Sequence, residues 1–65
     1  MRVLGVDPGL TRCGIGIVDG AVGSPISLVG VGVILTPTDA ALDQRLLDLD
    51  QQLSEWINLW KPDVI

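Results

Sequence analysis

The chain is poor in the residues that stabilise small domains or bind transition metals. It has 65 residues with no histidine, tyrosine or phenylalanine, one cysteine and two tryptophans. A single cysteine excludes an internal disulfide, and the lack of histidine leaves no ligand set for structural zinc. We therefore expect Cys13 to be a small buried apolar residue, which suits a reducing cytosol.

Positive charge and long hydrophobic runs are also scarce. Four basic residues stand against eight acidic ones, for a net charge of −4. Tight nucleic-acid binding needs clustered Lys and Arg, so this chain alone is not expected to bind DNA or RNA tightly. No apolar run approaches the ~20 residues of a membrane span. Asp7 also interrupts the first apolar stretch too early for a secretory signal. These observations predict a cytoplasmic protein with no membrane partner.

What the sequence does contain is enough apolar residues for one small sheet. Hydrophobic residues make up 48% of the chain, and this length is at most one domain. Nearly continuous apolar character predicts a first strand covered on both faces, and Pro8-Gly9 predicts a tight turn after it. Alternation and turn residues predict three strands and a hairpin loop: Arg2–Asp7, Arg12–Asp19, the loop Gly20–Ser24, and Ile26–Leu35.

Glycines within the second and third predicted strands need a physical reason, because glycine usually weakens a strand. They are Gly14, Gly16, Gly30 and Gly32. One explanation is the close approach of a packed helix, which we favour. The other is the close approach of a ligand to the backbone.

A helix is predicted after the third strand. Thr38 or Asp39 is expected to cap it, with Asp39 and Asp43 favourable near its positive end. Apolar residues recur at spacings of four and three on one face: Leu42, Leu46, Leu49, Leu53, Trp56 and Trp60. Lys61-Pro62-Asp63 is expected to end the helix. Val64-Ile65 would then begin a fourth strand, parallel to the first and beside it. Because that strand has only two residues, we expect an incomplete domain.

Asp7 is the residue most suggestive of chemistry. It ends a strand, where open α/β sheets place their ligand crevices, and it adjoins a turn of small residues that a phosphate could approach. Taken alone, Asp-Pro-Gly is a common turn in which the acid bonds the following backbone.

The whole amino-terminal string is more specific than its Asp-Pro-Gly core. Arg-Val-Leu-Gly-Val-Asp-Pro-Gly-Leu-Thr-Arg-Cys-Gly (Arg2–Gly14) closely resembles the start of the RuvC family of Holliday-junction resolvases, in particular its actinobacterial members. The segment Thr36–Leu42, with Gln44–Leu47, resembles that family's first helix, and Lys61–Ile65 resembles the lead-in to its fourth strand.

The resemblance implies an α/β, ribonuclease-H-like fold in which residues 1–65 are the amino-terminal part of a single nuclease domain. It implies a homodimeric endonuclease that cuts four-way junction DNA in recombination and repair, and works with the RuvA–RuvB branch-migration complex. Such enzymes use Mg²⁺, or Mn²⁺, held by four carboxylates. Asp7 matches the first as catalytic residue and metal ligand, while the other three have no counterpart here.

The resemblance also bears on the turn beside Asp7. Gly9, Thr11 and Arg12 could approach a DNA phosphate there, with Arg12 supplying a charge-assisted contact. Because one carboxylate cannot position two metal ions, the 65 residues alone are expected to be inactive.

Three other interpretations stay open on the sequence. The acid, the glycine two residues later, the hydroxyl residue and the glycine-bearing second strand also resemble the ATP phosphate-binding hairpin of the actin, chaperone-ATPase and sugar-kinase superfamily. A small RuvC-like family of nucleases also begins similarly. Alternatively, the chain is a non-catalytic truncated product whose exposed strand edge pairs with other chains.

Overall fold

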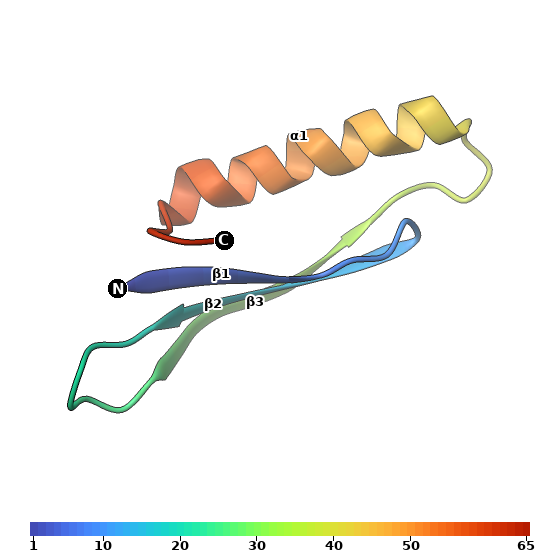
Figure 1. Cartoon of the computed structure of the whole chain (residues 1–65). Coiled ribbons are helices and arrows are strands. Elements are labelled where there is room, and N and C mark those ends of the chain that lie inside the picture. Colours follow the sequence, from blue (N-terminus) through green and yellow to red (C-terminus); the bar gives the residue numbers. More distant parts are fainter.

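The fold is a three-stranded sheet with one long helix across it (Figure 1). A computed structural model describes all residues, 1–65. The elements in chain order are β1 (Arg2–Asp7), β2 (Arg12–Asp19), β3 (Ser27–Leu35) and α1 (Leu42–Trp60). The predicted order of three strands and a helix is confirmed, with β3 starting one residue later than expected.

The sheet is an antiparallel meander in the order β1-β2-β3. Asp7 pairs with Gly14, and Gly14 pairs with Val33, so the β1–β2 turn and the end of β3 lie at the same end of the sheet. The register shifts between Ile17 and Val18, a bulge that leaves Val29 of β3 without a partner. Such a bulge increases the local twist of the strand.

The predicted start of a fourth strand is confirmed. Val64 forms an isolated parallel bridge with Val3, and the Leu4 N–H donates to the Val64 carbonyl at 2.9 Å. The helix has therefore carried the chain back along the sheet to the free edge of β1 (Figure 1).

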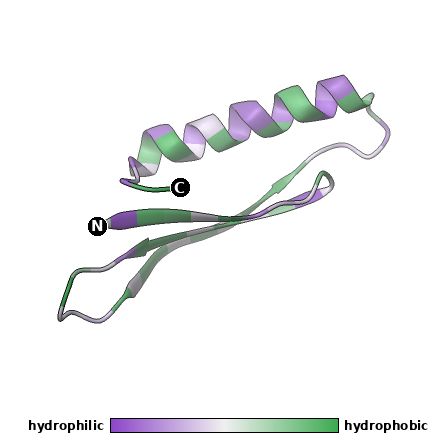
Figure 2. Ribbon diagram, viewed as in Figure 1, coloured by the Kyte–Doolittle hydropathy of each residue, from purple (hydrophilic) through white to green (hydrophobic).

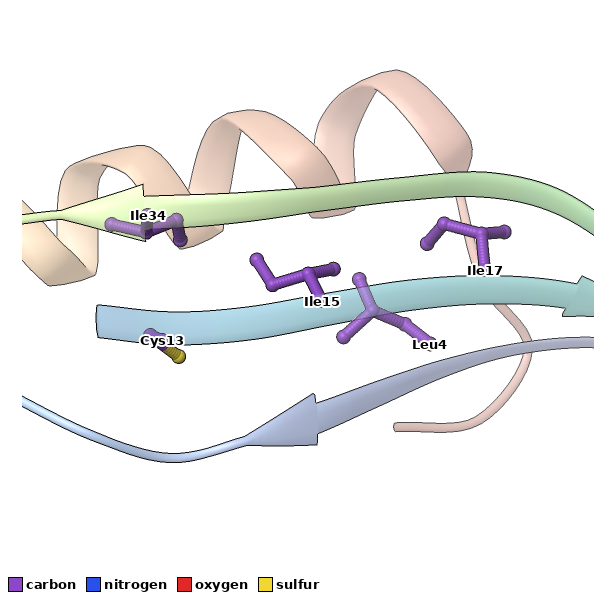
Figure 3. Packing of buried hydrophobic residues seen from close by; sticks show 5 residues of the cluster. All are labelled: Leu4, Cys13, Ile15, Ile17 and Ile34. Atoms are coloured by element: carbon purple, nitrogen blue, oxygen red, sulfur yellow. The ribbon is translucent and has the colours of Figure 1, made fainter.

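The core lies on one face of the sheet, between the strands and α1. Five hydrophobic side chains are buried there (Figure 3): Leu4, Cys13, Ile15, Ile17 and Ile34. The alternation predicted for β2 is confirmed, because its odd-numbered residues are the buried ones. Cys13 is a buried free thiol, as expected.

Glycines in β3 let the helix approach the sheet. A Cβ on Gly32 would overlap the Trp56 ring, and one on Gly30 would lie 3.0 Å from Cζ2 of Trp60. The two indole rings stack with centroids 6.4 Å apart. Close approach of the helix, the explanation that we favoured, is thus confirmed for Gly30 and Gly32. It does not hold for Gly14 and Gly16, which no part of the helix approaches.

Coverage of β1 on both faces was predicted wrongly. Leu4 is buried, but Gly5, Val6 and Asp7 are exposed. The single helix covers one face of the sheet, and the other face is open. That face carries the even-numbered residues of β2 and the β3 residues paired with them, including Val31, Val33 and Leu35.

The start of the helix was also predicted wrongly. The N-cap is Ala41, and no side chain caps the helix. Thr38 and Asp39 instead lie in a turn closed by the Ala40 N–H and the Pro37 carbonyl at 3.3 Å. This turn delays the first helical hydrogen bond, which runs from the Arg45 N–H to the Ala41 carbonyl at 3.0 Å.

The carboxyl-terminal end of α1 lies where the sequence predicted it, at Lys61-Pro62-Asp63. Lys61 adopts the left-handed conformation at φ 50° and its N–H donates to the Ile57 carbonyl, with Pro62 next in the chain. The carboxyl-terminal half of the apolar face packs on the sheet, whereas Leu42, Leu46 and Leu47 stay exposed. α1 lacks the run of hydrophobic residues that a membrane crossing would require.

Candidate functional site

Asp7 is the last residue of β1 and lies on the open face of the sheet. Paired residues of neighbouring strands share a face, and Asp7 pairs with Gly14, on the side opposite the buried Cys13 and Ile15. Its carboxylate is exposed and makes no hydrogen bond or ion pair within the chain. The carboxylate therefore does not tie down the turn that follows it, and both oxygens are free to accept a ligand.

The turn after Asp7 is too tight for a side chain at its second position. A Cβ on Gly9 would overlap the carbonyl oxygen of Arg12. The glycine is therefore required by the turn itself, whether or not a phosphate approaches. The same turn brings β2 back beside Asp7, where Gly14 leaves room: a Cβ there would lie 3.5 Å from that of Asp7.

Arg12 begins β2 on the same open face as Asp7. It pairs with Leu35, and it is two residues from Gly14 along the strand, which puts both on one side. Its side chain is exposed and makes no hydrogen bond or ion pair within the chain. The structure thus brings one free carboxylate and one free guanidinium to the same end and face of the sheet.

Thr11 differs from the other predicted site residues because its hydroxyl is already engaged. Arg45 Nη2 donates to Thr11 Oγ1 at 3.0 Å, and Arg45 Nε donates to Thr36 Oγ1 at 3.1 Å. The Thr36 hydroxyl in turn donates to the Leu10 carbonyl. Thr36 is the one buried polar side chain of the protein, at 5% exposed.

The sequence interpretation gave Thr36 and Arg45 no role at the site. Thr36 follows β3 and Arg45 belongs to the first turn of α1, so neither adjoins Asp7 in the sequence. Their neighbourhood exists only once the helix lies across the sheet. No spacing pattern could have indicated it.

The one ion pair of the protein lies at the opposite end of the sheet. Arg2 donates from Nε to Asp19 Oδ1 at 2.8 Å and from Nη2 to Oδ2 at 2.9 Å. This hydrogen bonding lowers the pKa of the Asp19 carboxyl and raises the pKa of Arg2. A shallow hollow of about 490 Å³ adjoins this pair, and Asp7 lines no hollow. The hollow is thus separate from the free carboxylate.

The donor set for a metal ion consists of Asp7 alone. No group of three or more acidic or thiol side chains in this chain could enclose an ion. Mg²⁺ keeps several waters and binds through one or two carboxylates together with substrate phosphates. An exposed, unpaired carboxylate fits one ligand of such a site, and these 65 residues supply no second one.

Comparison with known proteins identifies the family. The profile described as "Crossover junction endodeoxyribonuclease RuvC" matches residues 3–65. The chain belongs to the RuvC family. This membership favours the resolvase resemblance over the ATP-binding hairpin that the sequence also suggested.

Curated RuvC relatives align along the whole chain. The RuvC of Streptomyces avermitilis is 51% identical over 65 residues, which are 100% of this chain and 37% of that protein. The RuvC of Saccharopolyspora erythraea is 55% identical, again over the whole chain and over 33% of its own length. The chain therefore spans about a third of the curated relatives it matches.

Solved structures agree in fold. The Thermus thermophilus RuvC in complex with a Holliday junction substrate superposes with a TM-score of 0.86 at 26% identity, covering 98% of this chain and 41% of that one. A second Thermus thermophilus RuvC structure gives 0.82 at 27% identity, covering 98% and 40%. The fold is thus the ribonuclease-H-like fold of RuvC, present here as three strands, a helix and the start of a parallel strand.

Proposed function

We propose that the full-length protein carrying this sequence is a metal-dependent endonuclease that resolves four-way DNA junctions. The observation that carries the proposal is Asp7: an exposed, unpaired carboxylate at the end of β1, within the segment that matches the RuvC family. Support for the substrate is the Thermus thermophilus RuvC structure, which shares this fold and holds a Holliday junction.

In this proposal Asp7 is a catalytic residue and one ligand of a divalent ion, Mg²⁺ or Mn²⁺. A bound ion of this kind neutralises charge on the scissile phosphate and lowers the pKa of an attacking water. Asp7 supplies a negative oxygen at a fixed strand end, and Gly14 and Gly16 place no side chain on the face beside it. The other carboxylates are provided by residues outside 1–65.

The DNA backbone is proposed to approach the same end of the open face. Arg12 would donate to a phosphate oxygen, and the support is that its guanidinium is exposed and unpaired. Gly9 keeps the turn narrow enough for a strand of DNA to come near, and Thr11 retains the proton of its hydroxyl for donation. With a net charge of −4, these residues need further basic surface from the rest of the protein.

The larger organisation is part of the same proposal. Residues 1–65 would form the amino-terminal part of one nuclease domain. The complete enzyme would act as a homodimer, because symmetric cleavage of a four-way junction cuts two strands that are related by two-fold symmetry. It would receive junctions from the RuvA–RuvB branch-migration complex.

The test is cleavage of a synthetic four-way junction by the full-length protein with Mg²⁺. We expect Asp7→Asn to lower the single-turnover rate about a hundredfold or more, since a metal supplies several kcal/mol of transition-state stabilisation. The matched control is Asp50→Asn, an exposed helix acid with no hydrogen bond, which should keep the wild-type rate. Undiminished cleavage by Asp7→Asn, or none by the wild type, would contradict the proposal.

A further inference from the structure

A hydrogen-bonded cluster joins three separate segments at the end of the sheet that carries Asp7. It consists of Leu10, Thr11, Thr36 and Arg45, and we call it the turn clamp. Its segments are the β1–β2 turn, the linker after β3 and the first turn of α1. Figure 1 shows the turn and the start of the helix at the same end of the sheet.

Arg45 makes the clamp a single unit. Its guanidinium donates to two hydroxyls at once, at 3.1 Å to Thr36 and at 3.0 Å to Thr11. The planar fork of arginine suits two acceptors at fixed positions, whereas a lysine ammonium is a point charge on a flexible stem. Loss of Arg45 would therefore release Thr11 and leave Thr36 with one partner fewer.

Thr36 transmits this restraint to the backbone of the turn. Its hydroxyl donates to the Leu10 carbonyl, and its N–H donates to the Thr11 carbonyl at 3.4 Å. The side chain is 95% buried, so water cannot easily replace these bonds. The backbone that follows Asp7 is thus held by groups that have no contact with the open face.

We propose that Arg45 is a positioning residue for Asp7, holding the β1–β2 turn through Thr11 and Thr36 so that the carboxylate meets the metal and the scissile phosphate in a fixed geometry. This inference rests on the proposed nuclease function. Groups that orient metal ligands typically contribute 10–100-fold to metal affinity or activity when removed. α1 carries no proposed metal ligand itself, but through Arg45 it would affect the rate of cleavage.

The test compares Arg45→Gln, Arg45→Lys and wild type in the full-length protein. We expect Arg45→Gln to lower single-turnover junction cleavage about 10–100-fold and to raise the Mg²⁺ concentration for half-maximal rate. Junction binding measured without Mg²⁺ should stay at the wild-type level. Arg45→Lys should recover only part of the rate, because it cannot hold both hydroxyls.

A second measurement needs no activity. Amide hydrogen exchange should accelerate at residues 9–12 in Arg45→Gln. It should not do so in Gln52→Met, the matched control, which removes another helix-to-strand hydrogen bond, from Gln52 Nε2 to the Leu35 carbonyl at 3.3 Å. Should Arg45→Gln fail to fold, Thr36→Val against Thr36→Ser makes the same comparison, since only serine keeps the hydroxyl.

The outcomes separate the two proposals. In one outcome, the wild type cleaves the junction, Asp7→Asn abolishes cleavage, and Arg45→Gln keeps the wild-type rate, Mg²⁺ dependence and amide exchange. This result overturns the role of Arg45 and leaves the nuclease function standing. A rate loss in Arg45→Gln with unchanged Mg²⁺ dependence and turn exchange also overturns it, as a general structural defect. If the wild type does not cleave the junction, the nuclease function is overturned. Accelerated amide exchange at residues 9–12 in Arg45→Gln would still show that Arg45 holds the turn.

Discussion

Arg2 joins both layers of the protein through a single guanidinium. Besides its two bonds to Asp19, it donates from Nη1 to the Trp60 carbonyl at 2.9 Å, and it lies 5.6 Å from the centroid of the Trp60 ring. The last residue of α1 is thereby fixed to the first residue of β1. Arg2 serves the fold, in contrast to Arg12, whose charge is left unpaired at the proposed DNA surface.

The Arg2–Asp19 pair predicts a pH dependence of stability. Hydrogen bonding from Arg2 holds the pKa of Asp19 below its ordinary value. A carboxyl group of this kind stabilises the fold above its unfolded pKa of about 3.9, and the contribution disappears as the pH falls through the folded pKa. We expect Asp19→Asn to shrink the difference in the free energy of unfolding between pH 7 and pH 3, measured by urea denaturation.

The partner residue provides the control for this prediction. Arg2 remains charged over that range because the ordinary pKa of a guanidinium lies far above pH 7, so Arg2→Gln should shrink the same difference. The double variant should add nothing further, since each change removes the same pair. Retention of the full wild-type difference in Asp19→Asn would show that the pair does not stabilise the fold.

Among the elements, the strands and the helix were predictable to different degrees. Strict alternation placed Cys13, Ile15 and Ile17 on one face of β2, because a strand offers no other arrangement. The period of the helix predicted that Trp56 and Trp60 face the sheet. The periodicity of apolar residues is set by each segment alone, so the face that it predicts is also the face that packs in the folded chain.

What the sequence could not predict depends on contacts between segments. The turn at Pro37–Ala40 competed with capping by Thr38 and moved the start of the helix. Coverage of β1 on both faces depends on how many layers pack against the sheet. The apolar sequence of the strand does not determine that number. At the site, Asp7 was predictable from the strand end and the family resemblance, whereas the bonds of Arg45 required the packed helix.

The contact between β3 and α1 can be tested at Gly32. A Cβ there would overlap Cζ2 of Trp56 and lie 2.7 Å from its Cη2. We expect Gly32→Ala to lower the free energy of unfolding by about 1–3 kcal/mol, the usual cost of overpacking. The measurement is chemical denaturation of the full-length protein.

Gly16→Ala is the matched control for Gly32→Ala, because nothing lies within 4 Å of its added Cβ. Combining Gly32→Ala with Trp56→Leu should cost less than the sum of the two single changes, since the smaller side chain relieves the overlap. Equal losses for the two alanine variants would mean that the helix does not press on Gly32.

As a whole, the 65-residue molecule is a thin slab with one uncovered face. Its principal extents are 47 × 17 × 13 Å, and only five hydrophobic residues are buried. Hydrophobic residues colour much of all three strands in Figure 2, although the helix covers one side only. Open-face residues of β3 stay exposed, including Val31 at 73% and Leu35 at 59%. Contiguous exposed apolar surface of this kind drives association.

We therefore expect the isolated 65-residue chain to self-associate. Sedimentation velocity at micromolar concentration should show species larger than a monomer, and thermal unfolding followed by circular dichroism should lack a sharp transition. A monodisperse monomer with cooperative unfolding would contradict this expectation. It would mean that the small core alone offsets the entropy of ordering the chain.

The stacked indoles over β3 give the molecule a built-in optical reporter. Trp56 and Trp60 are its only tryptophans, and tyrosine is absent, so these two rings alone would dominate the ultraviolet emission of the 65-residue chain. Both sit where helix meets strand. A red shift in their emission would accordingly signal that α1 has lifted from the sheet, even while the strands remain paired.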